Sequence, residues 1–154
     1  MLLAADCAPI LFYDPVARVI AAAHGGWRGA LGGVVDATTA WMAELGADRF
    51  HIRAAIGPCI AWRSYEVGPE FPQPFVTEDP GNIRFFAPAP RLGRFFFDLR
   101  GYIAHRLARV GITTVEAAPH DTVTEEEQFF SYRRARQRGE RYYGLGLSAI
   151  VIEE

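Results

Sequence analysis

Hydrophobic residues near the start of the chain fall into short runs separated by turn residues. Runs at about 2–5, 10–14 and 18–24 are rich in the Val, Ile, Leu and Phe side chains that favour strands. The last two runs are joined by Asp14-Pro15-Val16-Ala17, and an Asp-Pro pair is typical of a turn. The pattern therefore predicts three strands, of which the last two form a hairpin.

The predicted hairpin brings one cysteine and one histidine face to face. If its loop is centred on Pro15 and Val16, Cys7 faces His24. Directly opposed residues of a hairpin share a face, with Cβ atoms about 4.5–5.5 Å apart. At that spacing a thiolate and an imidazole can bind one metal ion, or pair as nucleophile and base.

Two later segments carry apolar residues at helical spacing. These are residues 29–45 and 95–110, and each ends at a glycine, Gly46 or Gly111. A short acidic helix is also expected over residues 124–130, because acidic side chains are favourable in the first turn of a helix.

Strands and loops are expected elsewhere. Residues 65–71 are predicted to form a short helix or turn, and residues 72–94 and 131–141 to be mostly loop. Further strands are expected at about 50–56, 83–86, 112–115 and 145–152. Helices and strands are intermixed without strict alternation, which predicts an α+β fold with a mixed sheet in a single domain spanning residues 1–154.

Composition narrows the classes of protein to which the chain can belong. The net charge of −2 and the absence of a long basic block argue against nucleic acid as the main partner. No apolar stretch reaches the ~18 residues that span a membrane, and the N-terminus lacks the features of a signal peptide. Two cysteines are too few for a disulfide scaffold, so we expect a cytoplasmic protein with free thiols.

The residues after His24 are typical of a binding site. Glycines after a strand end allow the backbone to approach a ligand closely. Arg28 follows them near the start of a predicted helix, where a guanidinium beside helix N–H groups can bind phosphate or another oxyanion. The alternative for Arg28 is a surface ion pair.

Two later motifs offer candidate substrate contacts. Tyr65 and Glu66 can contact a base or ribose, or can form a capping turn. Arg133 and Arg134 can stack on a purine and pair with phosphate, or can contact RNA or solvent. They follow the aromatic residues Phe129, Phe130 and Tyr132.

Several of these motifs together resemble one known family, the YfiH-type laccase-domain proteins. They occur in collinear order from residue 4 to residue 134. They are Ala-Asp-Cys-Ala-Pro, the 17-residue step from Cys7 to His24, Gly-Trp-Arg-Gly, Ile56 to Ile60, Tyr65 to Glu70, and Phe129 to Arg134.

The resemblance implies a fold with α/β/β/α layers and a zinc ion held by His, Cys and His. Cys7 and His24 match the second and third of these ligands. Members of the family are called multicopper polyphenol oxidases. They are also described as zinc-dependent purine nucleoside enzymes that deaminate adenosine and cleave adenosine, inosine or methylthioadenosine by phosphorolysis. Small-molecule purine nucleosides and phosphate are therefore the expected partners.

The chain departs from the family pattern at the first metal ligand. In the family this ligand is a histidine upstream of the Ala-Asp-Cys motif, whereas here Met1 stands only six residues before Cys7. We therefore expect the domain to be N-terminally incomplete. The other histidines, His51, His105 and His120, are weak substitutes because each has a more ordinary structural interpretation.

These residues leave four functional hypotheses. The first is a zinc enzyme of purine nucleosides, with Cys7 and His24 as metal ligands, Arg28 as the catalytic anion clamp, and Tyr65 and Arg133 as substrate contacts. The second is copper-dependent oxidation of phenols, which four isolated histidines disfavour. The third is a cysteine hydrolase with Cys7 as nucleophile and His24 as base. The fourth is an inactive fragment or a structural module.

Overall fold

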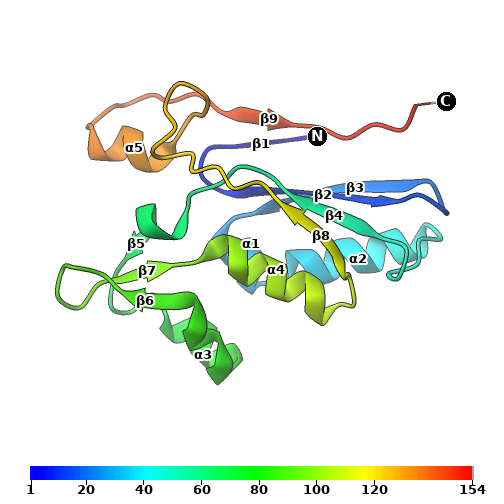
Figure 1. Ribbon diagram of the computed structural model, residues 1–154, viewed down its shortest axis with the longest axis horizontal. Helices are drawn as coiled ribbons and strands as arrows, with labels where there is room; N and C mark the ends of the chain where they lie inside the picture. The colour runs from blue at the N-terminus through cyan, green and yellow to red at the C-terminus, as the bar shows by residue number, and fades with distance from the viewer. Residues whose placement is uncertain (154) are drawn as a thin grey trace.

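A four-stranded mixed sheet forms the centre of the molecule in this computed structural model, which describes residues 1–153 (Figure 1). Its strand order is β3-β2-β4-β8. Strand β2 is antiparallel to β3 and β4, and β4 is parallel to β8. The expected α+β fold with a mixed sheet is confirmed. The strands are β2 (Ala8–Asp14), β3 (Val19–Gly25), β4 (Arg53–Ile56) and β8 (Thr114–Ala117).

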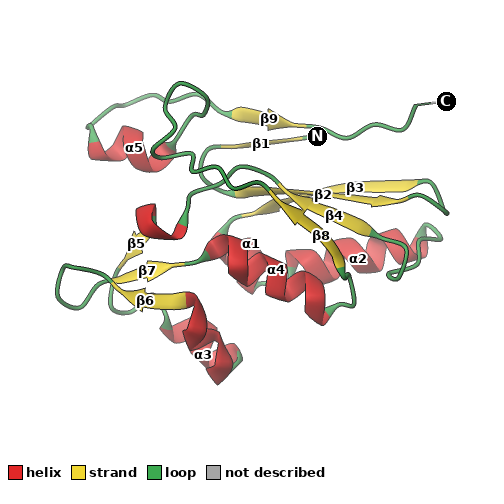
Figure 2. Ribbon diagram, in the orientation of Figure 1, coloured by secondary structure: helices red, strands yellow, loops and turns green. Residues whose placement is uncertain are grey.

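Helices cover one face of this sheet (Figure 2). They are α1 (Trp27–Leu31), α2 (Val34–Glu44) and α4 (Leu99–Arg109). Helix α2 packs on β3, while α4 packs on β4 and β8. The main core lies between the helices and the sheet because both surfaces bury aliphatic side chains there, among them Ile10, Val35, Met42, Ile56, Ile103 and Leu107.

A second, smaller sheet extends the core with aromatic residues. Its strands β5 (Glu66–Val67), β7 (Phe95–Phe97) and β6 (Phe86–Pro88) are antiparallel. Phe75, Phe86 and Phe97 pack against one another with ring centroids 4.8–5.4 Å apart. Helix α3 (Gln73–Glu78) and the 3-10 helix η2 (Pro80–Phe85) precede β6, and the 3-10 helix η1 (Trp62–Ser64) precedes β5.

A two-stranded ribbon and a short helix lie across the sheet from these helices (Figure 1). The ribbon pairs β1 (Leu2–Ala4) with β9 (Gly146–Ser148), so segments from opposite ends of the sequence lie side by side. Helix α5 (Tyr132–Gln137) lies in the same layer as this ribbon, to its left in Figure 1. No helix in residues 1–153 has the length and apolar character needed to cross a membrane.

The predicted register of the first hairpin is wrong by two positions. Pro9, not Cys7, lies opposite His24. The turn is longer than expected because the Asp14 carboxylate accepts hydrogen bonds from the Val16 and Ala17 N–H groups at 2.8 and 3.0 Å. This side-chain turn occupies residues 15–18, so Asp14 pairs with Val19 and every partner on β3 shifts by two positions.

Both long predicted helices are shorter than expected. The helix expected over 29–45 is divided between α1 and α2 at Gly33, whose φ of +89° is left-handed. The helix expected over 95–110 begins only at Leu99, because the Asp98 side chain caps it by accepting from Gly101 N–H at 2.9 Å. The residues before the cap form β7 instead.

The expectations for the C-terminal third are partly wrong. Residues 124–130 form turns and no helix, and the Thr124 hydroxyl at their start donates to the Asp121 carboxylate at 3.1 Å. Residues 131–141, expected to be a loop, contain α5, whose N-cap is Ser131. The expected strand at 145–152 is confined to β9.

Candidate active site

A cavity of about 770 Å³ opens between the central sheet and the smaller sheet. It is formed by the segment before β2, the end of β3, the start of α1, β5, the β6–β7 turn and the start of α5. The five residues that the sequence analysis assigned to a purine nucleoside enzyme all line it, although they are scattered from position 7 to position 133. They are Cys7, His24, Arg28, Tyr65 and Arg133.

Cys7 and His24 converge on Gly26 although they do not pair across the hairpin. A Cβ atom at Gly26 would lie 3.0 Å from Cys7 Sγ and 3.8 Å from His24 Nε2. The absence of a side chain at Gly26 therefore keeps open the space between the thiol and the imidazole. The expected convergence occurs, but through the turn after β3 and not through strand register.

The tautomer of His24 follows from its one hydrogen bond. His24 Nδ1 lies 3.2 Å from the Leu3 carbonyl oxygen, which can only accept. Nδ1 therefore carries the proton in neutral His24, and the lone pair on Nε2 faces the cavity. A backbone carbonyl that orients an imidazole in this way is typical of metal-ligating and general-base histidines.

Burial keeps the Cys7 thiol protonated. The pKa of Cys7 is raised above its usual value, chiefly by burial and also by the adjacent Asp6 carboxylate. A metal ion that binds this sulfur must therefore displace a proton. A buried thiol without a nearby compensating cation is a poor free nucleophile.

Asp6 is a site residue that the sequence analysis did not select. Its φ is +82°, and its buried carboxylate accepts hydrogen bonds from Thr122 Oγ1 at 2.7 Å and from Arg133 N–H at 2.5 Å. Asp6 thus ties the start of α5 to the segment that carries Cys7. Aspartate is among the few non-glycine residues that tolerate a left-handed conformation. An aspartate directly before Cys7 was therefore the feature of the sequence that could have indicated this role.

The cavity carries more positive than negative charge. Arg28 forms no ion pair within residues 1–153, and its guanidinium carbon lies 4.5 Å from the Trp27 ring centroid. Arg133 donates to the uncharged carbonyl oxygen of Glu66 at 2.8 Å. Two further arginines, Arg91 and Arg94, also line the cavity and were not selected from the sequence. This excess of cations suits an anionic ligand.

Aromatic rings form part of the cavity wall. Trp27 and Phe71 lie with ring centroids 4.8 Å apart, and Tyr65 packs 6.1 Å from Phe71. Burial raises the pKa of Tyr65 to about 12, with the nearby Cys7 adding to the effect, so its hydroxyl stays protonated at neutral pH. Tyr132 also lines the cavity.

Some candidates from the late aromatic and basic motif lie elsewhere. Phe129 and Phe130 line a separate small cavity of about 180 Å³ beside the β1–β9 ribbon. Arg134 donates to the carbonyl oxygens of Thr122 and Phe129 at 2.7 and 2.6 Å and so has a structural role.

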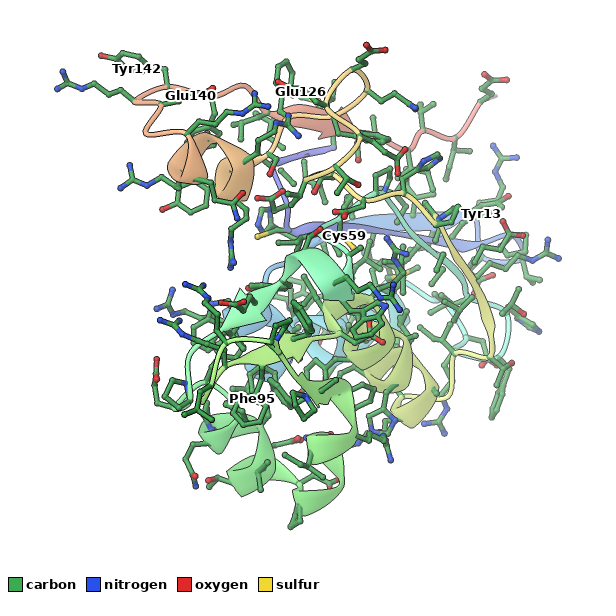
Figure 3. All side chains as sticks on the ribbon, turned by 60° about the vertical axis from the view of Figure 1, so that its left-hand side comes forward. Tyr13, Cys59, Phe95, Glu126, Glu140 and Tyr142 are labelled. Atoms are coloured by element: carbon green, nitrogen blue, oxygen red, sulfur yellow. The ribbon has the colours of Figure 1, made fainter. Side chains whose placement is uncertain are left out.

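The remaining histidines and the second cysteine lie outside the main cavity. His51 is exposed, and His105 contacts Arg84. His120 donates from Nδ1 to the Glu125 carboxylate at 2.7 Å. Cys59 is buried inside the molecule and does not line the main cavity (Figure 3). None of these histidines substitutes for a third metal ligand next to Cys7.

The donor set around Gly26 fits part of a zinc site. A thiol and an imidazole are ligands that zinc accepts, and catalytic zinc sites use three protein ligands and a water. Within residues 1–153 no three His, Cys, Asp or Glu side chains converge to hold a metal ion. Cys7 and His24 are therefore two side chains of the types that zinc accepts, and no third such side chain converges with them within residues 1–153.

Comparisons with known proteins place the chain in a family. The family model of the multi-copper polyphenol oxidoreductase laccases matches residues 1–153. A purine nucleoside phosphorylase of Rickettsia conorii is 33% identical over 97% of the chain, and YfiH of Escherichia coli, named a purine nucleoside phosphorylase, is 36% identical over 88%. The alignments cover 61% and 54% of those relatives, so the chain spans little more than half their length.

Solved structures share the fold. A Neisseria meningitidis protein of family DUF152 is 38% identical and superposes with a TM-score of 0.79 over 86% of this chain and 53% of its own. YfiH of Bacillus licheniformis is 29% identical, with a TM-score of 0.80 over 94% of this chain and 54% of its own.

Proposed function

Because the chain belongs to the multi-copper polyphenol oxidoreductase laccase family, with relatives named purine nucleoside phosphorylases, we propose that its cavity acts on purine nucleosides. The observation that carries the proposal is the convergence of Cys7, His24, Arg28, Tyr65 and Arg133 in one cavity. A volume of about 770 Å³ lies within the range of small-molecule sites.

The first proposed role is phosphate binding by Arg28. Its guanidinium has no carboxylate partner within residues 1–153, so an incoming phosphate does not have to displace one. In phosphorolysis a phosphate oxygen forms a bond to ribose C1′ while the bond from C1′ to the purine nitrogen breaks. The electron pair of that bond passes to the purine, which takes up a proton. Arg28 holds the attacking phosphate.

The second proposed role is substrate binding by Tyr65 and Arg133. The Tyr65 hydroxyl remains protonated and can donate a hydrogen bond to the base or ribose. The Arg133 guanidinium carbon lies 5.3 Å from the Tyr65 ring centroid, so the two side chains present one continuous surface. Trp27 and Phe71 supply apolar area against which a purine can pack.

The proposed cofactor is zinc, with Cys7 and His24 as two of its ligands. Zinc would supply a Lewis acid able to activate water for deamination of adenosine. His24 presents Nε2 with its lone pair free, and Cys7 would release a proton on binding the ion. Which of adenosine, inosine and methylthioadenosine is preferred depends on contacts to the base and the 5′ substituent.

Two alternatives have less support. Copper oxidation of phenols, suggested by the family's name, uses sites rich in imidazole, whereas His24 is the one histidine of the chain's four that lines the cavity. A cysteine hydrolase needs a thiolate at neutral pH, whereas burial raises the pKa of Cys7.

The test measures the release of base from inosine and adenosine by the purified chain, in the presence and absence of phosphate. Chromatography detects the released base, and the metal content of the chain is determined beforehand. We expect phosphate-dependent release of hypoxanthine or adenine, and a loss of roughly 10- to 100-fold in Arg28→Gln, the value of one charge-assisted hydrogen bond. Arg53→Gln is the matched control, because Arg53 lies on β4 outside the cavity. Base release that is absent, or unaffected by Arg28→Gln, would contradict the proposal.

A further inference from the structure

The wall of the cavity carries charged groups in two regions. One region surrounds Tyr65, and the other surrounds the adjacent residue Glu66. The groups that act on the Tyr65 phenol are the Cys7 thiol, the Asp6 carboxylate and the guanidinium groups of Arg28 and Arg133. Those that act on the Glu66 carboxylate are Arg91, Arg94 and Arg133. Tyr65 ends the 3-10 helix η1 and Glu66 begins β5, and both side chains line the cavity. Arg133 borders both regions, so they belong to one continuous site.

The region around Glu66 is held by a tight turn that carries two arginines. Arg94 N–H donates to the Arg91 carbonyl oxygen at 3.0 Å, and Gly93 between them has a φ of +75°. These are the features of a turn that requires glycine at its third position. The turn fixes the backbone of Arg91 and Arg94 relative to each other and directs both into the cavity lining.

Positive charge exceeds negative charge in this region. Arg91 pairs with the Glu66 carboxylate, and the Arg91 side chain is 71% exposed. Arg94 forms no ion pair or side-chain hydrogen bond within residues 1–153, and Arg133 donates to a carbonyl oxygen that carries no charge. Three guanidinium groups thus face one carboxylate. An exposed ion pair contributes little to stability, so Arg91 is available to a ligand that competes with Glu66.

We propose that Arg91 and Arg94 form a second anion site in the cavity, which binds a phosphoryl group carried by the nucleoside substrate. The inference rests on the proposed function and adds to it a substrate class, the phosphorylated nucleosides. Arg28 takes the free phosphate in the Tyr65 region, while the β6–β7 turn binds the phosphoryl group attached to the ligand. Arginine forks suit the oxygen atoms of a phosphoryl group.

Isothermal titration of the full chain with adenosine and with adenosine 5′-monophosphate, at constant ionic strength, tests this site. We expect the wild type to bind the monophosphate at least about tenfold more tightly than adenosine, because one charge-assisted hydrogen bond contributes about that much affinity. Arg94→Gln should reduce that ratio to near one. Arg94 is exposed and has no partner to lose, so the variant should fold. Arg53→Gln and Arg28→Gln should both retain most of the ratio.

Every other outcome contradicts the second anion site, its assigned ligand or the proposed function. Equal affinities for the two ligands, or a ratio that survives in Arg94→Gln and falls in Arg28→Gln, would overturn the second site. If free phosphate instead tightens adenosine binding through Arg94, the turn takes inorganic phosphate and the substrate assignment is wrong. Binding of the monophosphate through Arg94 without binding of adenosine would keep the site but contradict the proposed nucleoside function. Binding of neither ligand would overturn both.

Discussion

Replacing Asp6 with alanine should loosen the attachment of α5 to the cavity. The Asp6 carboxylate is buried and accepts hydrogen bonds from Thr122 Oγ1 at 2.7 Å and Arg133 N–H at 2.5 Å. Alanine removes both acceptors and leaves the Arg133 amide without its partner. Because Arg133 is a proposed substrate contact and Asp6 precedes Cys7, the change affects two walls of the site.

The expected cost can be worked from these contacts. Hydrogen bonds to a charged acceptor contribute about 1.5–3 kcal/mol each, and alanine at the Asp6 φ of +82° adds about 1 kcal/mol of backbone strain. The Thr122 hydroxyl can recover part of this by rotating. We therefore expect Asp6→Ala to lower the free energy of unfolding by about 3–5 kcal/mol. Asp6→Asn, which keeps one acceptor and tolerates the backbone, should cost about half as much.

Urea unfolding followed by circular dichroism measures the free energy, and amide hydrogen exchange measures the Arg133 N–H itself. Glu127→Ala is the matched control, because Glu127 is an exposed carboxylate beyond the cavity. If Asp6→Ala unfolds within 1 kcal/mol of the wild type, or if Arg133 exchange is unchanged, the carboxylate does not hold α5 as described.

Three further changes test separate parts of the structure. Gly26→Ala places a Cβ 3.0 Å from Cys7 Sγ, so the thiol should shift. Zinc affinity, measured by competition with a chelator, should then fall roughly tenfold. Unchanged affinity would show that zinc binding does not need the space at Gly26. Burial raises the pKa of Tyr65 to about 12, whereas the unfolded phenol ionises near pH 10, so wild-type stability should fall by up to about 2 kcal/mol as the pH rises from about 10 towards 12. Tyr65→Phe should lose less over that range in parallel urea titrations, and an identical decline would exclude Tyr65 as its cause. Arg106→Ala removes a buried guanidinium that pairs with Asp36, so it should lower the free energy of unfolding, measured by thermal unfolding, by about 3 kcal/mol. Arg109→Ala removes a half-exposed ion pair and should lower it by less than about 1 kcal/mol. Similar losses in the two variants would contradict the difference in burial.

The fold class could be predicted from the sequence because it depends on local pattern, whereas the candidate site residues were selected from motifs that resemble a known family. Runs of β-branched and aromatic residues located the central strands, and the motifs around Cys7, His24 and Tyr65 identified residues that do share one cavity. Register could not be predicted in the same way. Whether Cys7 or Pro9 faces His24 depends on the Asp14 carboxylate, whose choice of backbone donors sets the length of the turn.

The missed site residues depend on long-range contacts that have no local signature. Asp6 binds Thr122 and Arg133, which are more than 100 positions away in the sequence. Arg91 and Arg94 lie in a proline-rich segment that the sequence analysis expected to be loop, and only the β6–β7 turn brings them to the cavity. Residues 124–130 do not form the expected helix, and the Glu125 carboxylate instead accepts from the Asp121 N–H.

The most direct measurement is a double-mutant cycle of zinc affinity on Cys7→Ala, His24→Ala and the double variant, by competition with a chelator at fixed pH. If the two side chains bind one ion beside Gly26, each single change should weaken zinc binding by at least about 100-fold, and the double change should cost clearly less than the two combined. Affinity equal to the wild type in either single variant, or fully additive losses, would contradict a shared metal ion at Cys7 and His24.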